Sequence, residues 1–116
     1  MMKKDQQQTN LVKADLHEVT MPLIHAMHVE LKELSKKKPD AVLSKNKVKI
    51  VNRLLESCRK VSDSETSLDY LDLIDEDDIP QNSDVVLMLS QYVAAMKQFK
   101  STYYGSDGLK LRWFTE

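Results

Sequence analysis

Hydrophobic residues recur at helical spacing through the first third of the chain. From about Asn10 to Lys37 they are three or four residues apart, which places them on one helix face: Leu16, Val19, Leu23, Met27, Leu31 and Leu34. Pro22 falls inside this pattern, where a proline removes a backbone hydrogen bond. Either the helix kinks at Pro22, or Thr20 caps a new helix after an earlier short one. We expect a kink, because the hydrophobic face continues in phase.

The middle of the chain predicts a second helix, from about Ala41 to Val61. Pro39 disfavours helix in the residue before it, and Asp40 can cap the helix after it, with Ser44 as an alternative start. The expected inner face consists of Val48, Val51, Leu54, Leu55, Cys58 and Val61. This helix is also basic along its outer side.

The second half of the chain predicts a short helix, a long helix and a tail. Hydrophobic residues indicate a short helix over residues 68–75, and the last helix runs from Asn82 or Ser83 to about Tyr104. Its Val85–Met96 stretch is the densest hydrophobic run, but twelve residues are too few to cross a bilayer. We therefore expect a buried core helix and no membrane partner. Residues 109–114 come after an Asp107-Gly108 turn signal and suggest a short strand or a hook.

These elements predict an all-α fold. The expected architecture is a mostly antiparallel bundle of about four helices, three long and one short, with a short C-terminal appendage. Two glycines and three prolines in 116 residues agree with helices joined by short loops. We expect a flexible N-terminus at residues 1–9, one helical domain at 10–105, and a tail at 106–116 that packs on the bundle or on a partner. The single cysteine, Cys58, favours a reducing, cytoplasmic location.

Charge is strongly segregated along the chain, although the net charge is only −1. Residues 32–60 carry ten basic and three acidic side chains, and residues 63–84 carry nine acidic and no basic ones. Such polarity steers association with charged partners or with a second copy of the chain.

The acidic segment is the first candidate site. Its carboxylates gather near the C-terminal end of the expected short helix, where the helix dipole disfavours negative charge: Asp69, Asp72, Asp75, Glu76, Asp77 and Asp78. Because this placement of negative charge is locally unfavourable, we expect the carboxylates to interact with another molecule or another part of the chain. They are expected to bind a basic protein, or to pair with the basic helix of the same chain or of a second copy in a homo-oligomer.

The basic helix is the second candidate site. Lys45, Lys49, Arg53 and Lys60 recur at nearly one per turn on its outer side and could contact phosphates. Nucleic-acid binding is therefore the alternative function. The near-neutral net charge argues against it, because dedicated nucleic-acid-binding domains are usually basic overall.

The C-terminal aromatic residues are a third candidate surface. Tyr104, Arg112 and Trp113 are of the types that dominate interface energetics. They are expected either to pack on the bundle or to contact a partner.

The sequence contains few residues that could bind a metal or carry out catalysis. Glu18, His25 and His28 share one side of the first helix and are weak candidates for metal ligands. No nucleophile motif or phosphate-binding loop occurs in the sequence, which predicts no catalytic residues and no cofactor. The sequence favours a small non-enzymatic helical protein-interaction module of the accessory, regulatory or inhibitor type.

Overall fold

The computed structural model describes residues 7–69 and 71–116, and they form a mostly helical molecule. Three α-helices, α1 (Leu11–Lys37), α2 (Lys45–Val61) and α3 (Asn82–Tyr103), precede two short strands, β1 (Tyr104–Ser106) and β2 (Leu111–Trp113), in this described part. Two 3-10 turns, η1 (Thr66–Leu68) and η2 (Glu76–Asp78), lie in the connection between α2 and α3. None of the described helices combines the length and the hydrophobicity that a membrane span requires.

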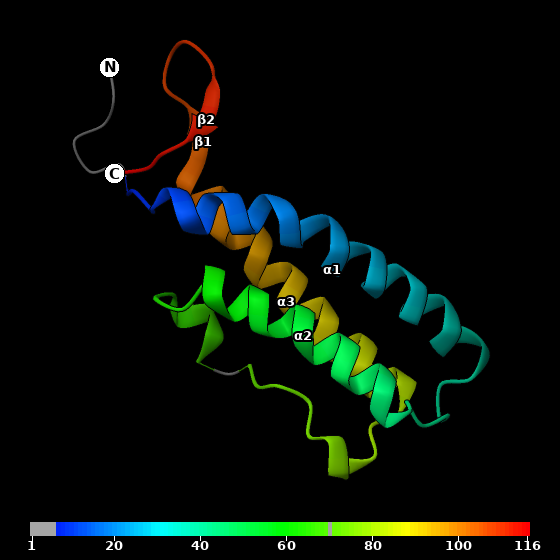
Figure 1. Ribbon diagram of the computed structural model, residues 1–116. Helices are drawn as coiled ribbons and strands as arrows, with labels where there is room; N and C mark the ends of the chain where they lie inside the picture. Colours follow the sequence, from blue (N-terminus) through cyan, green and yellow to red (C-terminus); the bar gives the residue numbers. More distant parts are fainter. Residues whose placement is uncertain (1–6, 70) are drawn as a thin grey trace.

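The direction of the helices differs in part from a simple antiparallel bundle. Helix α1 runs antiparallel to both α2 and α3, but α2 and α3 run parallel to each other (Figure 1). They begin at the same end of the molecule, where Val42 and Gln81 form an isolated bridge and the Leu43 N–H donates to the Pro80 carbonyl over 2.9 Å. The connection over residues 62–81 must therefore run back along the whole length of α2. We call this stretch the acidic connector.

Helix α1 is continuous through Pro22. Asn10 caps it by accepting a hydrogen bond from the Lys13 N–H over 2.8 Å, and the helix extends unbroken to Lys37. The alternative in which Thr20 caps a separate helix is therefore wrong. Thr20 is instead buried, at a position inside the helix.

The buried face of α1 agrees only in part with the one that the spacing of the large hydrophobic residues predicts, since Leu31 is buried and Leu16, Met27 and Leu34 are partly buried against the core. Ala14, His17, Thr20, Ile24 and Leu31 are buried, whereas the side chains of Val19 and Leu23 are 64% and 51% exposed. Small residues on this face suit the packing of α1 against α3, and the His17 Nε2 forms a hydrogen bond with the Met96 carbonyl. The hydrophobic stripe that contains Val19 and Leu23 lies beside this contact and faces outward.

Helix α2 begins later than expected but buries the predicted face. Ser44 is its N-cap and accepts a hydrogen bond from the Lys47 N–H over 3.3 Å. Val48, Val51, Leu55, Cys58 and Val61 are buried, and Leu54 is partly buried. Burial raises the pKa of the Cys58 thiol to about 12, so this cysteine is a small hydrophobic core residue, as expected.

The short helix expected over residues 68–75 is wrong. Only the single turn η1 forms, and residues 71–75 have no helical structure. Side chains of α2 and α3 form hydrogen bonds with backbone N–H and carbonyl groups that would have paired with each other in a helix. Asn52 bonds both backbone groups of Ile74, Arg59 donates to the Leu71 carbonyl, and the Tyr92 hydroxyl donates to the Asp72 carbonyl over 2.9 Å. Tertiary contacts thus override the local helical pattern.

Helix α3 forms the centre of the core. Val85, Leu89, Tyr92, Met96 and Phe99 are at most 1% exposed, and α3 packs against both α1 and α2. This agrees with the prediction of a buried central helix.

The C-terminal segment folds back as a hairpin. Strands β1 and β2 pair antiparallel with Tyr104 opposite Trp113, and the turn between them contains Gly108 with a φ of 96°, which a glycine adopts without strain. Beyond β2, Phe114 is buried, and its carbonyl accepts a hydrogen bond from the Thr9 N–H over 2.9 Å. Most of the flexible N-terminus expected at residues 1–9 lies outside the described residues.

Candidate partner-binding surface

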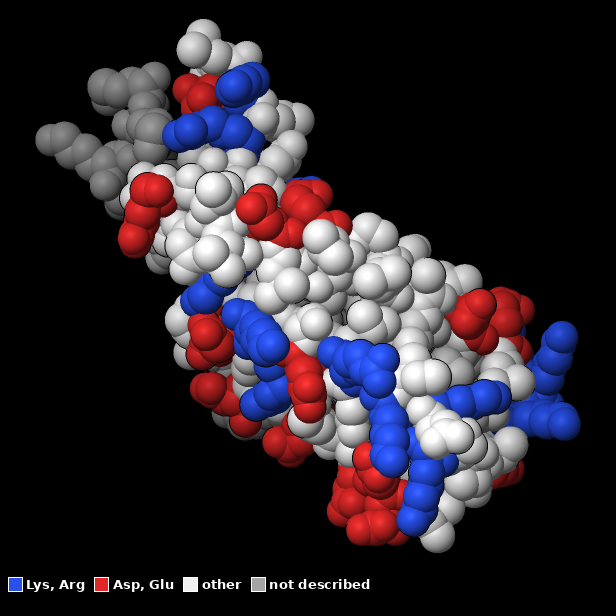
Figure 2. Space-filling view, in the orientation of Figure 1, with Lys and Arg blue, Asp and Glu red and all other residues white. Residues whose placement is uncertain are grey.

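The acidic connector lies beside the basic helix because α2 and α3 are parallel. Asp77 of η2 approaches Lys45 at the start of α2, with 3.7 Å between its Oδ1 and the lysine Nζ. Figure 2 shows the acidic residues of this region gathered next to the basic residues over α2. Both side chains of this ion pair are exposed, at 71% and 87%, so solvent screens it strongly.

Within the described residues, most of the candidate carboxylates make no ion pair. Among residues 7–69 and 71–116, Asp77 is the one member of the predicted acidic set with a cationic partner. The Asp75 carboxylate caps η2 by accepting a hydrogen bond from the Asp77 N–H over 2.9 Å. Ile79, which ends η2, has a left-handed backbone with a φ of 49°, unusual for a β-branched residue. This tight loop holds Asp77 and Asp78 on the surface.

Four carboxylates line one cleft, which we call the acidic cleft. It has a volume of about 320 Å³ and lies between the connector and the first turns of α3. Its carboxylates are Asp72, Asp75, Asp78 and Asp84, and its floor includes Ile74, Val85 and Met88. Asp84 has a structural role as well, because it accepts a hydrogen bond from the Gln81 N–H in the capping box of α3. The predicted acidic set lacks Asp84, although the sequence places this residue in the first turn of the last helix.

Asp69 lies on a second depression, at the other end of the connector. This depression, of about 390 Å³, is also lined by Asp72, Glu65, Asp63 and the cation Arg59. Glu65 accepts a hydrogen bond from the Tyr103 hydroxyl over 3.1 Å, and Asp63 pairs with Lys13 over 2.6 Å. These carboxylates therefore brace the connector against α1 and α3. Burial, with the Glu65 charge adding to it, raises the pKa of the Tyr103 hydroxyl.

The structure does not bring the weak metal candidates together. The Glu18 carboxylate accepts a hydrogen bond from the Trp113 indole over 2.8 Å and lies 3.4 Å from the Lys100 ammonium. Desolvation raises the pKa of Glu18, but the Trp113 hydrogen bond and the Lys100 charge outweigh it, so the pKa is lowered. Within the described residues no group of three or more His, Cys, Asp or Glu side chains could hold a metal ion.

The C-terminal aromatic residues contact their own chain. The Trp113 ring packs edge-on against His17 at 5.1 Å and against Tyr104 at 5.5 Å, measured between ring centroids. The Lys100 ammonium lies 4.5 Å from the centre of the Tyr104 ring, and Arg112 pairs with Asp107 over 3.1 Å. The contacts with His17 and Lys100 fasten the hairpin to α1 and α3, whereas the contacts of Trp113 with Tyr104 and of Arg112 with Asp107 lie within the hairpin.

His17 is a buried residue whose importance the sequence did not reveal. Its Nε2 donates to the Met96 carbonyl over 2.8 Å, and its Nδ1 has no hydrogen-bond partner among the described residues. Burial lowers its pKa, although the Met96 hydrogen bond and Glu18 oppose the shift. His17 is therefore neutral near pH 7, with its proton on Nε2.

The predicted basic residues are exposed along α2. Lys45, Lys49, Arg53 and Lys60 all project from the surface, and several basic side chains of α2 appear on the face in Figure 2. The structure therefore forms two charged surfaces next to each other, one on α2 and one on the connector.

Comparison of the chain with protein-family models, with curated proteins and with solved structures finds no match. The function must therefore be inferred from these surfaces themselves.

Proposed function

We propose that the chain is a small non-enzymatic protein-interaction module that binds a basic protein partner through its acidic connector. The partner would contact the acidic cleft (Asp72, Asp75, Asp78 and Asp84) and the adjoining carboxylates of Asp69, Glu76 and Asp77. The observation that carries this proposal is the absence of cations, within the described residues, paired with Asp72, Asp75 or Asp78.

The arrangement of charge supports a partner over pairing within the chain. The basic helix lies next to the connector, so the carboxylates had lysines within the same molecule to pair with. Among the described residues, the weak contact between Asp77 and Lys45 is the one ion pair between the connector and α2. A basic partner would relieve the mutual repulsion of the remaining carboxylates, and such complementarity raises both association rate and specificity.

The aromatic tail has a supporting role in this proposal. Tyr104 and Trp113 already contact residues of α1 and α3, and Arg112 is paired with Asp107. Their contribution to partner binding would come from holding the hairpin in place.

The exposed row of basic residues on α2 favours one alternative, an accessory nucleic-acid-binding protein. Lys45, Lys49, Arg53 and Lys60 would contact phosphates, and the affinity would fall steeply with salt concentration. The acidic connector beside α2 weakens this alternative because it repels phosphate.

Capture of the tagged protein's partners from native lysate, with and without nuclease, tests one proposal against the other. If the chain binds a basic protein, the same proteins are recovered under both conditions. Loss of the recovered proteins after nuclease, with nucleic acid in the untreated sample, would contradict the proposed function and favour the alternative.

A further inference from the structure

The C-terminal hairpin depends for its stability on its contact with the helices. It projects beyond the ends of α1 and α3 (Figure 1), and at its tip Leu109 and Leu111 are 94% and 66% exposed. Each strand has three residues, and a two-stranded hairpin of this size has little stability of its own. Trp113 contacts both helices: its indole donates to Glu18 of α1 over 2.8 Å, and its ring lies 6.0 Å from that of Phe99 of α3, between centroids.

His17 of α1 lies at the centre of this contact. Its ring packs edge-on against Trp113 at 5.1 Å and stacks with Phe99 at 5.8 Å, between centroids. The residue is 1% exposed. Its Nε2 bonds the Met96 carbonyl, whereas its buried Nδ1 has no hydrogen-bond partner among the described residues. One nitrogen of a titratable ring is therefore left unpaired beneath the hairpin.

A proton on His17 would make Nδ1 a second donor. While the hairpin is docked, this N–H has no acceptor among the described residues, and burying a charged group without a partner is costly. Attraction of the cation to the rings of Trp113 and Phe99 opposes this cost but is weaker. Burial lowers the pKa of His17, which agrees with this balance. Once Trp113 leaves, water can hydrate the charged ring, so the proton favours the undocked hairpin.

The charged side chains around His17 on the helices largely compensate one another. Glu18 of α1 favours the protonated ring and Lys100 of α3 disfavours it. These two groups pair with each other over 3.4 Å, so their effects partly cancel. Lys13, one turn before His17, pairs with Asp63 over 2.6 Å.

The other titratable groups at the hairpin keep their charge state in mild acid. Hydrogen bonds from backbone N–H groups of the turn lower the pKa of Asp107, which pairs with Arg112. The pKa of Glu18 is lowered as well, so both carboxylates stay ionised at pH 5. Burial raises the pKa of Tyr103, which stays neutral. His17 is the group described at this contact whose charge changes between pH 7 and pH 5.

We propose that His17 is a pH sensor that releases the C-terminal hairpin in mild acid while the three helices stay folded. The helices keep a core of their own, in which Ile24, Leu55 and Leu89 are fully buried. Below the ordinary histidine pKa of 6.5, the proton binds better to the undocked form and shifts the equilibrium towards it. Release uncovers the aromatic rings beneath Trp113. This switch does not involve the acidic connector and goes beyond the proposed function.

Hydrogen exchange of single backbone amides, followed by NMR, measures how often the hairpin opens. The Phe114 N–H, bonded to the Tyr103 carbonyl over 2.6 Å, and the Thr9 N–H, bonded to the Phe114 carbonyl over 2.9 Å, report on the hairpin. The Leu55 N–H inside α2 reports on unfolding of the helices. At pH 6.5 the hairpin amides should be protected at least about tenfold less than Leu55, because the hairpin opens while the helices stay folded. Between pH 6.5 and pH 5 their protection, corrected for the intrinsic exchange rate, should fall by about tenfold.

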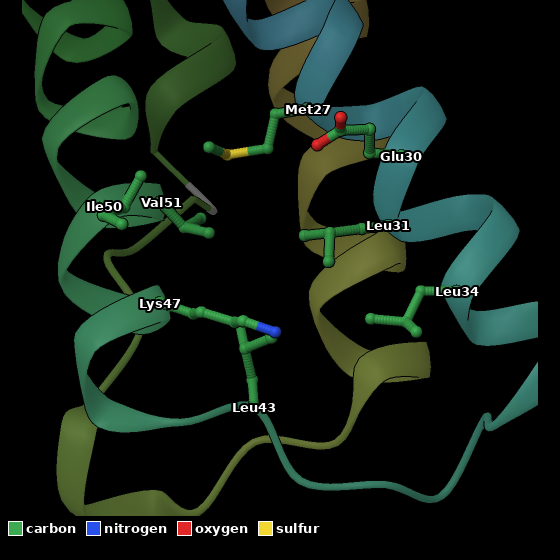
Figure 3. Close-up of a pocket in the computed structure, with 8 residues that line it drawn as sticks. All are labelled: Met27, Glu30, Leu31, Leu34, Leu43, Lys47, Ile50 and Val51. Carbon is green, nitrogen blue, oxygen red and sulfur yellow. The ribbon is translucent and has the colours of Figure 1, made fainter.

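Two histidine variants supply the test and its matched control. His17→Gln should abolish the fall, because glutamine can donate to the Met96 carbonyl but does not titrate. Burial also lowers the pKa of His28, but this residue lies about 16 Å further along α1. There Met27 and Glu30 line a hydrophobic groove of about 400 Å³ between α1 and α2, away from the hairpin (Figure 3). His28→Gln should therefore keep the full fall.

The readout is the ratio of protection at the two pH values, so a His17→Gln hairpin that is looser at both of them still gives a result. Three results would overturn the proposal: no fall in the unchanged protein, an equal fall in His17→Gln and His28→Gln, or hairpin amides that are as well protected as Leu55. The last would show that the hairpin opens only when the whole chain unfolds.

Discussion

Asn52 of α2 bonds both backbone groups of Ile74 in the acidic connector. Its side-chain amide donates to the Ile74 carbonyl over 2.8 Å, and its side-chain oxygen accepts from the Ile74 N–H over 2.9 Å. Ile74 itself is buried, so water cannot replace these bonds easily. One side chain thereby holds the connector against α2 and positions the carboxylates on either side of Ile74.

Replacing Asn52 with alanine should destabilise the protein by about 2 kcal/mol, because a buried N–H and a buried carbonyl lose their partners. Urea unfolding followed by circular dichroism measures this loss. Asn46→Ala, at an exposed position of the same helix, is the control and should change the free energy of unfolding little. Equal stability of the two variants would contradict the role assigned to Asn52.

The buried His17 predicts that stability falls in mild acid. Burial lowers its pKa in the folded state, so between this value and the ordinary 6.5 the unfolded state binds more protons than the folded one. The contribution of His17 to the free energy of unfolding is therefore complete above about pH 6.5 and decreases as the pH falls below this value. A proton on Nδ1 would also lack an acceptor among the described residues.

His17→Gln should reduce this pH dependence, because glutamine can still donate to the Met96 carbonyl but does not titrate. The free energy of unfolding, measured between pH 5 and 7.5, should fall less steeply in this variant than in the unchanged protein. Some dependence should remain, since burial and Lys32 also lower the pKa of His28. His25→Gln, at an exposed position, is the control, and equal slopes in the two variants would show that His17 is not the cause.

The sequence predicted the three long helices well, because each has a long hydrophobic pattern at helical spacing, although the N-caps of α2 and α3 are Ser44 and Gln81. It predicted only part of the face of α1 that is buried, namely the part with Leu16, Met27, Leu31 and Leu34. That face contains Ala14, His17 and Thr20, and their burial depends on the close fit to α3 and on the Met96 carbonyl. Hydrophobic spacing alone pointed to the neighbouring stripe of larger side chains.

The connector could not be predicted for a related reason. Leu68, Leu71 and Ile74 have helical spacing, but Asn52, Arg59 and Tyr92 bond the backbone there and no helix forms over residues 71–75. These three side chains come from elements distant in sequence, and local patterns contain no information about them. The acidic residues of the site were visible in the sequence, whereas the cleft and the groove between α1 and α2 arise only from the packing of the helices.

Quantitative capture with neutralised variants tests the proposed function most directly. Asp72→Asn, Asp75→Asn and Asp78→Asn combined remove three charges from the acidic cleft. Asp15→Asn, Asp40→Asn and Glu56→Gln combined remove three charges from exposed positions elsewhere. If the cleft binds a basic partner, nuclease-treated lysate yields that partner with the unchanged protein and with the second variant, but at least about tenfold less with the first. Equal recovery with all three proteins would contradict the proposed function.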